Sequence, residues 1–201
     1  MISAREQLAG AGTQTAALAF GGFTAATEEY NGTAWSGGGN LITSRYGLGA
    51  AGTQTAALAI GGYTTPAITT ATEEYNGTAW SGGGNMIIAR GYLGGAGTQT
   101  AALAFGGWTP AVQSATEEYN SGTWSSGGNL IIARIVMGGA GTQTAGLAFG
   151  GQTPATTAAT EEYTAGVWGP GGNLATGRNA LGGAGTQAAA LAFGGVDPAV
   201  T

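Results

Sequence analysis

The sequence predicts an all-β fold of repeated four-stranded antiparallel sheets, and three observations lead to this prediction. The segment AGTQTAALAFGG at 11–22 returns with small changes at 51–62, 96–107, 140–151 and 184–195. A second block, ATEEY with a Trp five residues after its Tyr, follows four of these copies. The corresponding threonines are 40, 45, 44 and 44 residues apart, a period typical of propeller blades. We therefore expect a small β-propeller forming one domain over residues 1–201.

Each repeat divides into four short strands. The repeats run approximately from 8–45, 48–90, 93–134 and 137–178, with a half repeat at 181–201. In the third repeat, LGGAG is a strand of small residues, and TQT turns the chain into ALAF, where Leu103 and Phe105 alternate with alanines as a period of two requires. ATEEY predicts the third strand. A turn at 120–122 then leads to a fourth strand that carries Trp124.

The strand count predicts an unfinished ring. The first two strands of the repeat occur five times, and the last two occur four times. We expect five blades whose inner strands close a ring, the fifth blade lacking its outer strands. Two alternatives are a four-bladed ring with an appended hairpin and an unfinished blade completed by another chain, because an unpaired edge invites pairing between subunits.

The composition excludes several classes of function. With five Arg, no Lys and a net charge of -5, the chain lacks the clustered positive charge that nucleic-acid binding requires. The absence of His and Cys removes the usual general base, the commonest metal ligand and all Ser-His or Cys-His arrangements. We expect no enzymatic activity, no cofactor, no metal and no membrane partner. No signal peptide is seen, and the compartment is left open between a virion and the extracellular space.

The repeat resembles the kelch repeat over nearly the whole chain. The resemblance rests on the double Gly that ends the second strand, the Tyr of the third, the Trp of the fourth and the Arg before the next repeat. It implies a propeller with Tyr and Trp packed between blades. The chain departs from the kelch pattern in its short Tyr-to-Trp spacing, and it lacks the His and Cys of the kelch-fold copper radical oxidase. Its low-charge repeats also resemble those in structural proteins of marine bacteriophages.

The charged residues are expected to hold the blades together. Each Arg occupies one phase of the repeat, and each third strand carries a Glu pair. We expect each Arg to pair with a Glu through bidentate contacts; the alternative is a ring of carboxylates for cations or for acid-base work. The residues are Arg5, Arg45, Arg90, Arg134, Arg178, Glu28, Glu29, Glu73, Glu74, Glu117, Glu118, Glu161 and Glu162.

Aromatic side chains fall into two groups. Trp35, Trp80, Trp124 and Trp168 share one place in the fourth strand and are expected to form core between blades, with sugar stacking as the alternative. The connections from strand two to three and from strand four to the next repeat vary, and in an up-and-down blade both lie at one end. Binding residues usually sit on such loops. The candidates are Phe23, Tyr46, Tyr63, Tyr92, Trp108 and Gln152.

These observations favour a non-enzymatic binding module that recognises a carbohydrate or a protein surface through its variable rim. The alternative is a structural or virion assembly protein that forms homo-oligomers through the open edge of the incomplete blade. A closed ring would favour the first function, and pairing between chains would favour the second.

Overall fold

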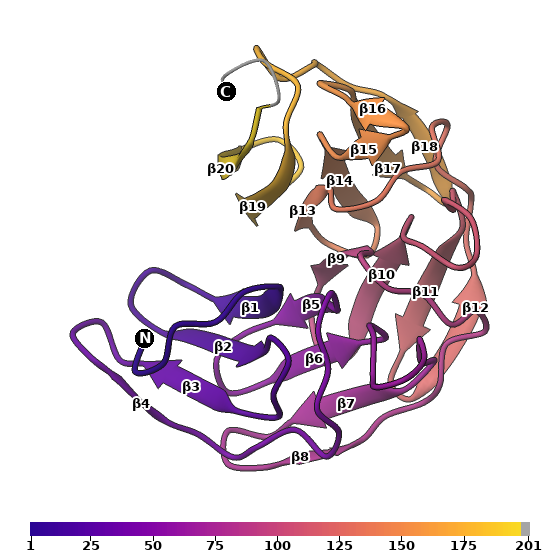
Figure 1. Ribbon diagram of the computed structural model, residues 1–201. Coiled ribbons are helices and arrows are strands. Elements are labelled where there is room, and N and C mark those ends of the chain that lie inside the picture. Colours follow the sequence, from indigo (N-terminus) through magenta and orange to yellow (C-terminus); the bar gives the residue numbers. More distant parts are fainter. Residues whose placement is uncertain (198–201) are drawn as a thin grey trace.

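The computed structural model describes residues 1–197 and contains strands without helices in that range. Four antiparallel sheets of four strands each follow one another along an arc, and a two-stranded sheet ends the arc (Figure 1). Strand order within every sheet follows the chain, so each blade is an up-and-down meander. The predicted repeated four-stranded sheets in a propeller-like arrangement are confirmed.

The strand bounds repeat from blade to blade. In the first blade they are β1 (Leu8–Gly12), β2 (Ala17–Gly21), β3 (Thr27–Tyr30) and β4 (Trp35–Gly37). In the second they are β5 (Gly49–Gly52), β6 (Ala57–Ile60), β7 (Thr72–Tyr75) and β8 (Trp80–Gly82). In the third they are β9 (Gly94–Gly97), β10 (Ala101–Phe105), β11 (Thr116–Asn120) and β12 (Thr123–Ser126).

The fourth blade contains one addition. Its sheet consists of β13 (Gly138–Gly141), β14 (Ala145–Phe149), β17 (Thr160–Thr164) and β18 (Val167–Pro170). The sequence predicts an irregular loop between β14 and β17. In the structure this loop contains a short hairpin of two strands with two residues each, β15 (Gln152–Thr153) and β16 (Ala155–Thr156). Pro154 stands between these strands, and its fixed φ suits a tight turn. The final sheet contains β19 (Asn179–Gly185) and β20 (Ala190–Val196).

Side chains alternate between the two faces of each second strand, and this alternation divides the core into layers that lie between neighbouring blades. Ala102 and Ala104 pack against Leu58 and Ile60 of the preceding blade. Leu103 and Phe105 pack against the following blade. Each second strand therefore contributes to two layers, and each layer belongs to two blades. This arrangement gives a blade little core of its own and makes its stability depend on its neighbours.

The inner strands of the last units approach one another so closely that no Cβ fits at Gly139 or Gly183, whereas the second blade carries Ala50 at the same position of the repeat. A Cβ on Gly139 would lie 2.6 Å from the carbonyl oxygen of Gly95. A Cβ on Gly183 would lie 2.5 Å from the carbonyl oxygen of Gly139. The GG pair of the first strand thus serves the packing of neighbouring blades around the arc.

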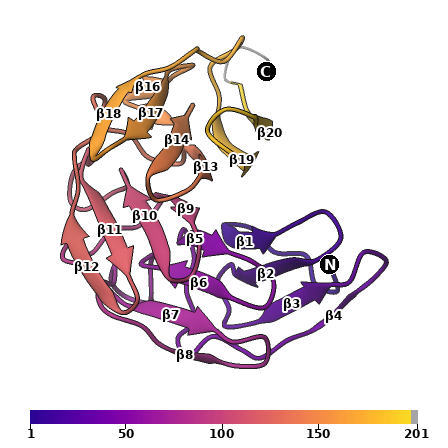
Figure 2. The same ribbon diagram turned by 180° about the vertical axis from the view of Figure 1, so that it is seen from behind.

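The arc does not close, which corrects the expectation that five inner strands form a ring. Strand β1 packs beside β5, β5 beside β9, β9 beside β13 and β13 beside β19. Strand β1 and the β19–β20 pair lie on opposite sides of an opening in both views (Figures 1 and 2). The physical reason is that the fifth unit has no third strand within residues 1–197, and in the complete blades the third strand supplies groups to which the following blade binds.

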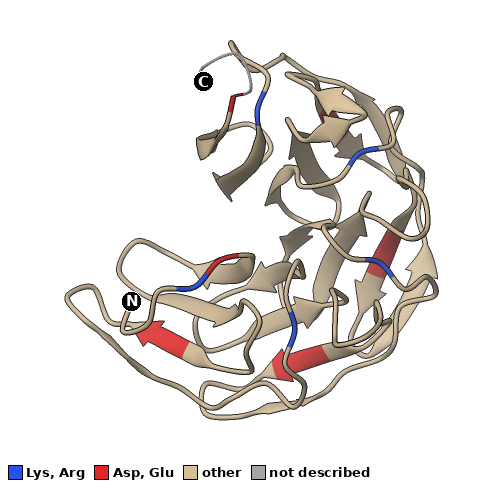
Figure 3. Ribbon diagram, in the orientation of Figure 1, with Lys and Arg blue, Asp and Glu red and all other residues tan. Residues whose placement is uncertain are grey.

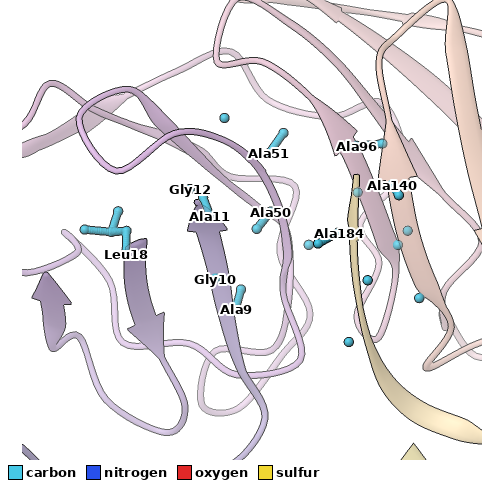
Figure 4. Close-up of a pocket in the computed structure, with 18 of the residues that line it drawn as sticks. Ala9, Gly10, Ala11, Gly12, Leu18, Ala50, Ala51, Ala96, Ala140 and Ala184 are labelled. Atoms are coloured by element: carbon cyan, nitrogen blue, oxygen red, sulfur yellow. The ribbon is translucent and has the colours of Figure 1, made fainter. Parts of the chain in front are cut away.

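The five inner strands surround a central hollow of about 730 Å³, which is open to solvent (Figure 4). Its wall is mostly glycine and alanine, including Ala51, Ala96, Ala140 and Ala184. No titratable side chain belongs to the lining. The hollow therefore offers mainly backbone and methyl groups. No helix of residues 1–197 is long and apolar enough to cross a membrane.

Candidate functional site at one rim

The two variable connections of each repeat meet at one rim of the arc. Backbone bridges join them in pairs, Tyr46 with Tyr63, Gly91 with Trp108, and Ile135 with Gln152. In each pair, one residue precedes the first strand of a blade and the other follows a second strand. This places four of the candidates, Tyr46, Tyr63, Trp108 and Gln152, at the same end of their blades.

Four of the six candidates form a continuous aromatic ladder. Phe23 stacks on Tyr46 with ring centroids 4.0 Å apart and an interplanar angle of 20°. Tyr46 stacks on Tyr63 at 5.2 Å and 13°, and Tyr63 contacts Tyr92 at 5.1 Å and 48°. The Tyr92 hydroxyl donates a hydrogen bond of 2.9 Å to Oε1 of Gln7. The aromatic ladder, Phe23, Tyr46, Tyr63 and Tyr92, thus crosses from the first blade to the third.

A staircase of backbone hydrogen bonds supports one end of the ladder. The amide of Gly47 donates to Gln7, Tyr92 to Gly47, Val136 to Tyr92, and Ala180 to Val136, with lengths of 2.6–3.0 Å. All five residues have φ between 48° and 57°, so this left-handed conformation belongs to the repeat. Tyr92 is therefore held by the scaffold and not by the ladder alone.

Phe23 differs from its counterparts in the other blades. Its φ is 62°, a conformation that costs energy in a residue with a side chain. Tyr63, Trp108 and Gln152 occupy the same position of the repeat without this feature. Phe23 is also 54% exposed, while its ring is stacked on Tyr46. One end of the ladder thus presents an aromatic ring to solvent.

The remaining two candidates lie on the rim outside the ladder. Trp108 exchanges backbone hydrogen bonds of 2.7 and 3.0 Å with Gly91, and within residues 1–197 no ring contact joins it to the ladder. Gln152 exchanges backbone bonds with Ile135, and its side-chain amide donates to the carbonyl of Pro154 at 3.3 Å. The structure therefore brings together Phe23, Tyr46, Tyr63 and Tyr92, and it leaves Trp108 and Gln152 apart.

Two tyrosines of the ladder, Tyr63 and Tyr92, remain protonated at ordinary pH. Burial, and then the proximity of Tyr92 and Tyr46, raises the pKa of Tyr63 above its usual value. Burial, and then Tyr46, raises the pKa of Tyr92. Their hydroxyls consequently act as neutral donors and acceptors, and the ladder offers apolar ring surface with polar tips.

The charged residues form salt bridges within each repeat junction, and Figure 3 shows the Glu pairs on third strands beside the Arg-bearing connections. Four bridges of 2.8–3.0 Å join an Arg to the first Glu of the next third strand: Arg5–Glu28, Arg45–Glu73, Arg90–Glu117 and Arg134–Glu161. The side chains are at most 5% exposed.

The contact between each Arg and its Glu is not the expected bidentate one. In Arg134, Nη2 donates to Glu161 Oε1 at 2.8 Å, and Nη1 donates to the carbonyl oxygens of Gly150 and Ala159. The other carboxylate oxygen of Glu161 accepts a bond of 2.6 Å from the amide of Ile131. The guanidinium is thus shared between the carboxylate and the backbone that ends the second strand.

Burial and charge act in opposite directions on these buried pairs. Burial lowers the pKa of Arg45, Arg90 and Arg134, and the paired glutamate opposes this change. Burial would raise the pKa of Glu28, but the amides of Ile2 and Ser3 and the Arg5 guanidinium lower it below its usual value. Each salt bridge holds its Arg-bearing connection against the third strand.

In the first three Glu pairs, the second Glu has a role that was not predicted from the sequence. The Tyr75 hydroxyl donates to Glu29 of the preceding blade at 2.5 Å, Tyr119 to Glu74 at 2.5 Å and Tyr163 to Glu118 at 2.6 Å. Burial, and then this hydrogen bond, raises the pKa of each tyrosine to about 12. Strand alternation was the available signal, since adjacent glutamates must face opposite sides of a sheet.

Two further side chains complete each junction. Trp80, Trp124 and Trp168 donate indole N–H bonds of 2.8–3.0 Å to threonines of the preceding blade, Thr27, Thr72 and Thr116. Gln143 donates to the carbonyl oxygens of Ala102 (3.3 Å) and Tyr119 (2.6 Å), and the other junctions repeat this with Gln54, Gln99 and Gln187. From the sequence this glutamine was expected only in a turn, although its presence in all five copies indicated a further role.

The first and last units leave these groups unused. Tyr30 and Trp35 contact each other at 5.2 Å but are only half-buried, whereas their counterparts in later blades are buried. At the other end, Glu162 is exposed. The arc therefore ends in one unoccupied Tyr/Trp pair and one unoccupied Glu/Thr pair.

Comparison with known proteins adds no support to the resemblance between this repeat and the kelch repeat. The kelch-like pattern consequently stays a prediction about family, while the propeller-like arrangement of the sheets stands on the structure itself. No protein-family model matches this chain, and no curated protein matches it.

Proposed function

We propose that this protein is a non-enzymatic binding module whose ligand contacts the aromatic ladder. The observation that carries the proposal is the continuous contact of Phe23, Tyr46, Tyr63 and Tyr92, residues from separate connections that converge on one rim. Phe23 is exposed and the three tyrosines are half-buried, and aromatic residues that are fixed by stacking lose little conformational entropy on binding. A non-enzymatic role also accords with the glutamates, because Glu117 and Glu118 are engaged in holding blades together.

The geometry of the ladder favours a protein surface over a carbohydrate. A sugar stacks on the face of an aromatic ring, and the faces between Phe23 and Tyr46 and between Tyr46 and Tyr63 are occupied by each other. The outer face of Phe23 is then the principal platform. A protein surface can instead use the ring edges and hydroxyls of all four residues, as tyrosine does at many interfaces.

The test compares ligand binding by the wild-type chain and by Phe23→Ala/Tyr46→Ala/Tyr63→Ala. Binders are selected from a displayed library of small protein domains, and in parallel the chain is applied to an oligosaccharide array. The ladder variant should lose at least ~90% of the binding, since aromatic anchors dominate interfaces. Val167→Ala, an exposed apolar residue elsewhere, should bind as wild type. Equal binding by both variants would refute the proposal, and binding confined to the array would identify a carbohydrate ligand.

A second candidate function is assembly between chains, and the unclosed arc favours it. The first blade offers Tyr30 and Trp35 without a preceding blade, and the last complete blade offers Glu162 without a following Tyr. Head-to-tail contacts of this kind produce rings or filaments. The resemblance to phage structural proteins would place such an assembly in a virion. Light scattering across a concentration series tests this function: a constant mass of 19.4 kDa would rule it out.

A further inference from the structure

A second cavity, of about 230 Å³, lies between the fourth blade and the β19–β20 pair. Leu147, Phe149, Thr160, Glu162, Leu174 and Ala192 are among the residues that line it. Thr160 is only 7% exposed, whereas Glu162 is exposed. The cavity thus combines an apolar wall with a buried hydroxyl and an accessible carboxylate.

The same place is filled by one Tyr and one Trp in the three preceding junctions. Between the third and fourth blades, Trp168 donates its indole N–H to Thr116 at 2.8 Å and packs on Phe105 with centroids 5.1 Å apart. Tyr163 donates to Glu118 at 2.6 Å. In the fourth blade, Thr160, Glu162 and Phe149 are the counterparts of these acceptors and of the phenylalanine. After Trp168 the sequence contains neither Tyr nor Trp.

The inner half of the fifth unit is already in place beside the cavity. Gln187 donates to the carbonyl oxygens of Gly146 (2.9 Å) and Tyr163 (2.8 Å), as its counterparts do in complete blades. Strand β19 packs beside β13. The junction therefore has its inner strands and its glutamine contacts, and it lacks the outer hairpin.

Strand β20 presents a free edge next to the cavity. In complete blades, the second strand pairs on both sides, as β14 does with β13 and β17. Within residues 1–197, β20 pairs only with β19, and Leu191 and Phe193 are 63% and 51% exposed. An unpaired edge is a template for strand addition.

Besides Thr160 and Glu162, Arg178 is a third polar side chain that a bound segment can contact. The other four arginines form salt bridges with a Glu of the following third strand. Arg178 reaches the carbonyl oxygens of Gly194 at 3.1 Å and Ala192 at 3.4 Å, as Arg134 reaches those of Gly150 and Ala148. Up to residue 197, however, the fifth unit has no third strand to supply a carboxylate. A strand added to β20 in the register of the repeat would bring a Glu to this guanidinium.

We propose that this cavity and the free edge of β20 bind a β-hairpin of the Thr-Glu-Glu-Tyr type, with a Trp opposite its Tyr, of the kind that fills the three preceding junctions. The first strand of the hairpin pairs with β20. Its first Glu meets Arg178, its Tyr donates to Glu162, and its Trp packs on Phe149 and donates to Thr160. This inference is independent of the aromatic ladder.

The same site is filled in the three preceding junctions of the molecule, and these junctions show what the site binds. Three junctions show which side chains the site accepts, and cross-strand register places Tyr119 opposite Trp124 and Tyr163 opposite Trp168 in those hairpins. The donor must therefore present the two rings from adjacent strands directly across from each other. A single strand or an isolated aromatic side chain would satisfy only part of the site.

The first arm of the test supplies the hairpin within the same chain. The segment 26–38 (ATEEYNGTAWSGG) is appended after residue 201, and a matched variant carries Ala in place of its Tyr and Trp. The native hairpin should raise the melting temperature by at least ~4 °C relative to the Ala version, because ~1 kcal/mol shifts a domain of this size by ~2–4 °C. This arm does not depend on an isolated hairpin, which is marginally stable in water.

The second arm measures binding of the labelled 26–38 peptide to the wild-type chain by fluorescence anisotropy. The Ala-substituted peptide should bind at least ~10-fold more weakly, and so should the native peptide to Thr160→Val/Glu162→Ala, each tenfold loss corresponding to ~1.4 kcal/mol. Glu6→Ala serves as the carboxylate control, and Tyr46→Ala/Tyr63→Ala as the ladder control; both should bind the peptide as wild type does.

Two results together would overturn the proposal: no gain in melting temperature from the native appended hairpin, and equal binding of the native and Ala-substituted peptides. An oligomer of the chain that the peptide dissociates would support the proposal and identify a second copy as the donor. Peptide binding by a chain that stays monomeric would support the site while ruling out self-assembly. Failure of the ladder variants to lose ligand leaves both arms unaffected, so the two proposals fail separately.

Discussion

The hydroxyl of Tyr163 donates a 2.6 Å hydrogen bond to Glu118 across the junction of the third and fourth blades, although 45 residues separate the two in sequence. The same bond recurs with the same partners in two other junctions. The third strands of the first three blades therefore have a double function, since the first Glu secures its own blade and the second receives the next blade. Stability should consequently be concentrated in contacts between blades.

Replacing Tyr163 by Phe should lower the free energy of unfolding by ~1–2 kcal/mol, because Glu118 loses a hydrogen bond in a partly buried site. Tyr30→Phe is the matched control, since Tyr30 has the same place in the first blade but no blade in front of it. Chemical denaturation of both variants measures the difference. Equal effects would show that the hydroxyl bond between blades contributes nothing.

Alkaline pH should destabilise the protein through the three interblade tyrosines. Their pKa is raised from about 10 to about 12 in the folded state, so their contribution is fully present below pH 10 and is lost as the pH rises through about 12. Thermal unfolding measured over this range should show a falling melting temperature. The triple variant Tyr75→Phe/Tyr119→Phe/Tyr163→Phe should show a weaker dependence in that window, and an unchanged slope would contradict the assignment.

Arg134→Met should destabilise the fold by ~3–5 kcal/mol, because it leaves Glu161 buried without its counter-charge. Arg178→Met should cost much less. Arg178 occupies the same place in the fifth unit, whose two strands include no partner glutamate. Denaturant titration of the two variants isolates the carboxylate contact from the rest of the arginine's contribution. Similar losses would indicate that the bonds to carbonyl oxygens dominate.

Gly139→Ala should cost ~1–3 kcal/mol, since the added Cβ would meet the carbonyl of Gly95 and the ring of Phe105 within 2.8 Å. Gly82→Ala is the control, because nothing lies within 4 Å of a Cβ at that position. Its free energy of unfolding should change by less than ~1 kcal/mol. A tolerant Gly139 would mean that the inner strands can move apart at small cost.

The fold could be predicted from the sequence to the level of the blade. The recurrence of Ala-Leu-Ala-Phe, with its alternation, and of Glu-Glu-Tyr before a turn determines each four-stranded sheet locally. Closure could not be predicted, because it depends on whether the first unit finds its acceptors on the last. The sequence shows that the first blade carries Tyr30 and Trp35. It does not show whether these side chains come close to β20 in three dimensions.

Only part of the candidate site could be predicted from the sequence, because the rest depends on how separate blades lie relative to one another. Variation between repeats indicates which rim to inspect, and it selects Tyr63 and Trp108 equally. Only the three-dimensional structure distinguishes them, since Tyr63 lies between Tyr46 and Tyr92, while Trp108 pairs through its backbone with Gly91. Ring stacking depends on side-chain direction across blades, and that information is absent from a period of 44 residues.

The opening in the arc makes this molecule energetically a linear array. In a circular propeller every blade is held from two sides, whereas here the first blade and the β19–β20 pair each have one neighbour, as at the ends of a solenoid. Unfolding should therefore begin by fraying at the termini and progress inwards unit by unit. Repeats could also be gained or lost without disturbing a closure, so the length of such a protein is free to vary in steps of one blade.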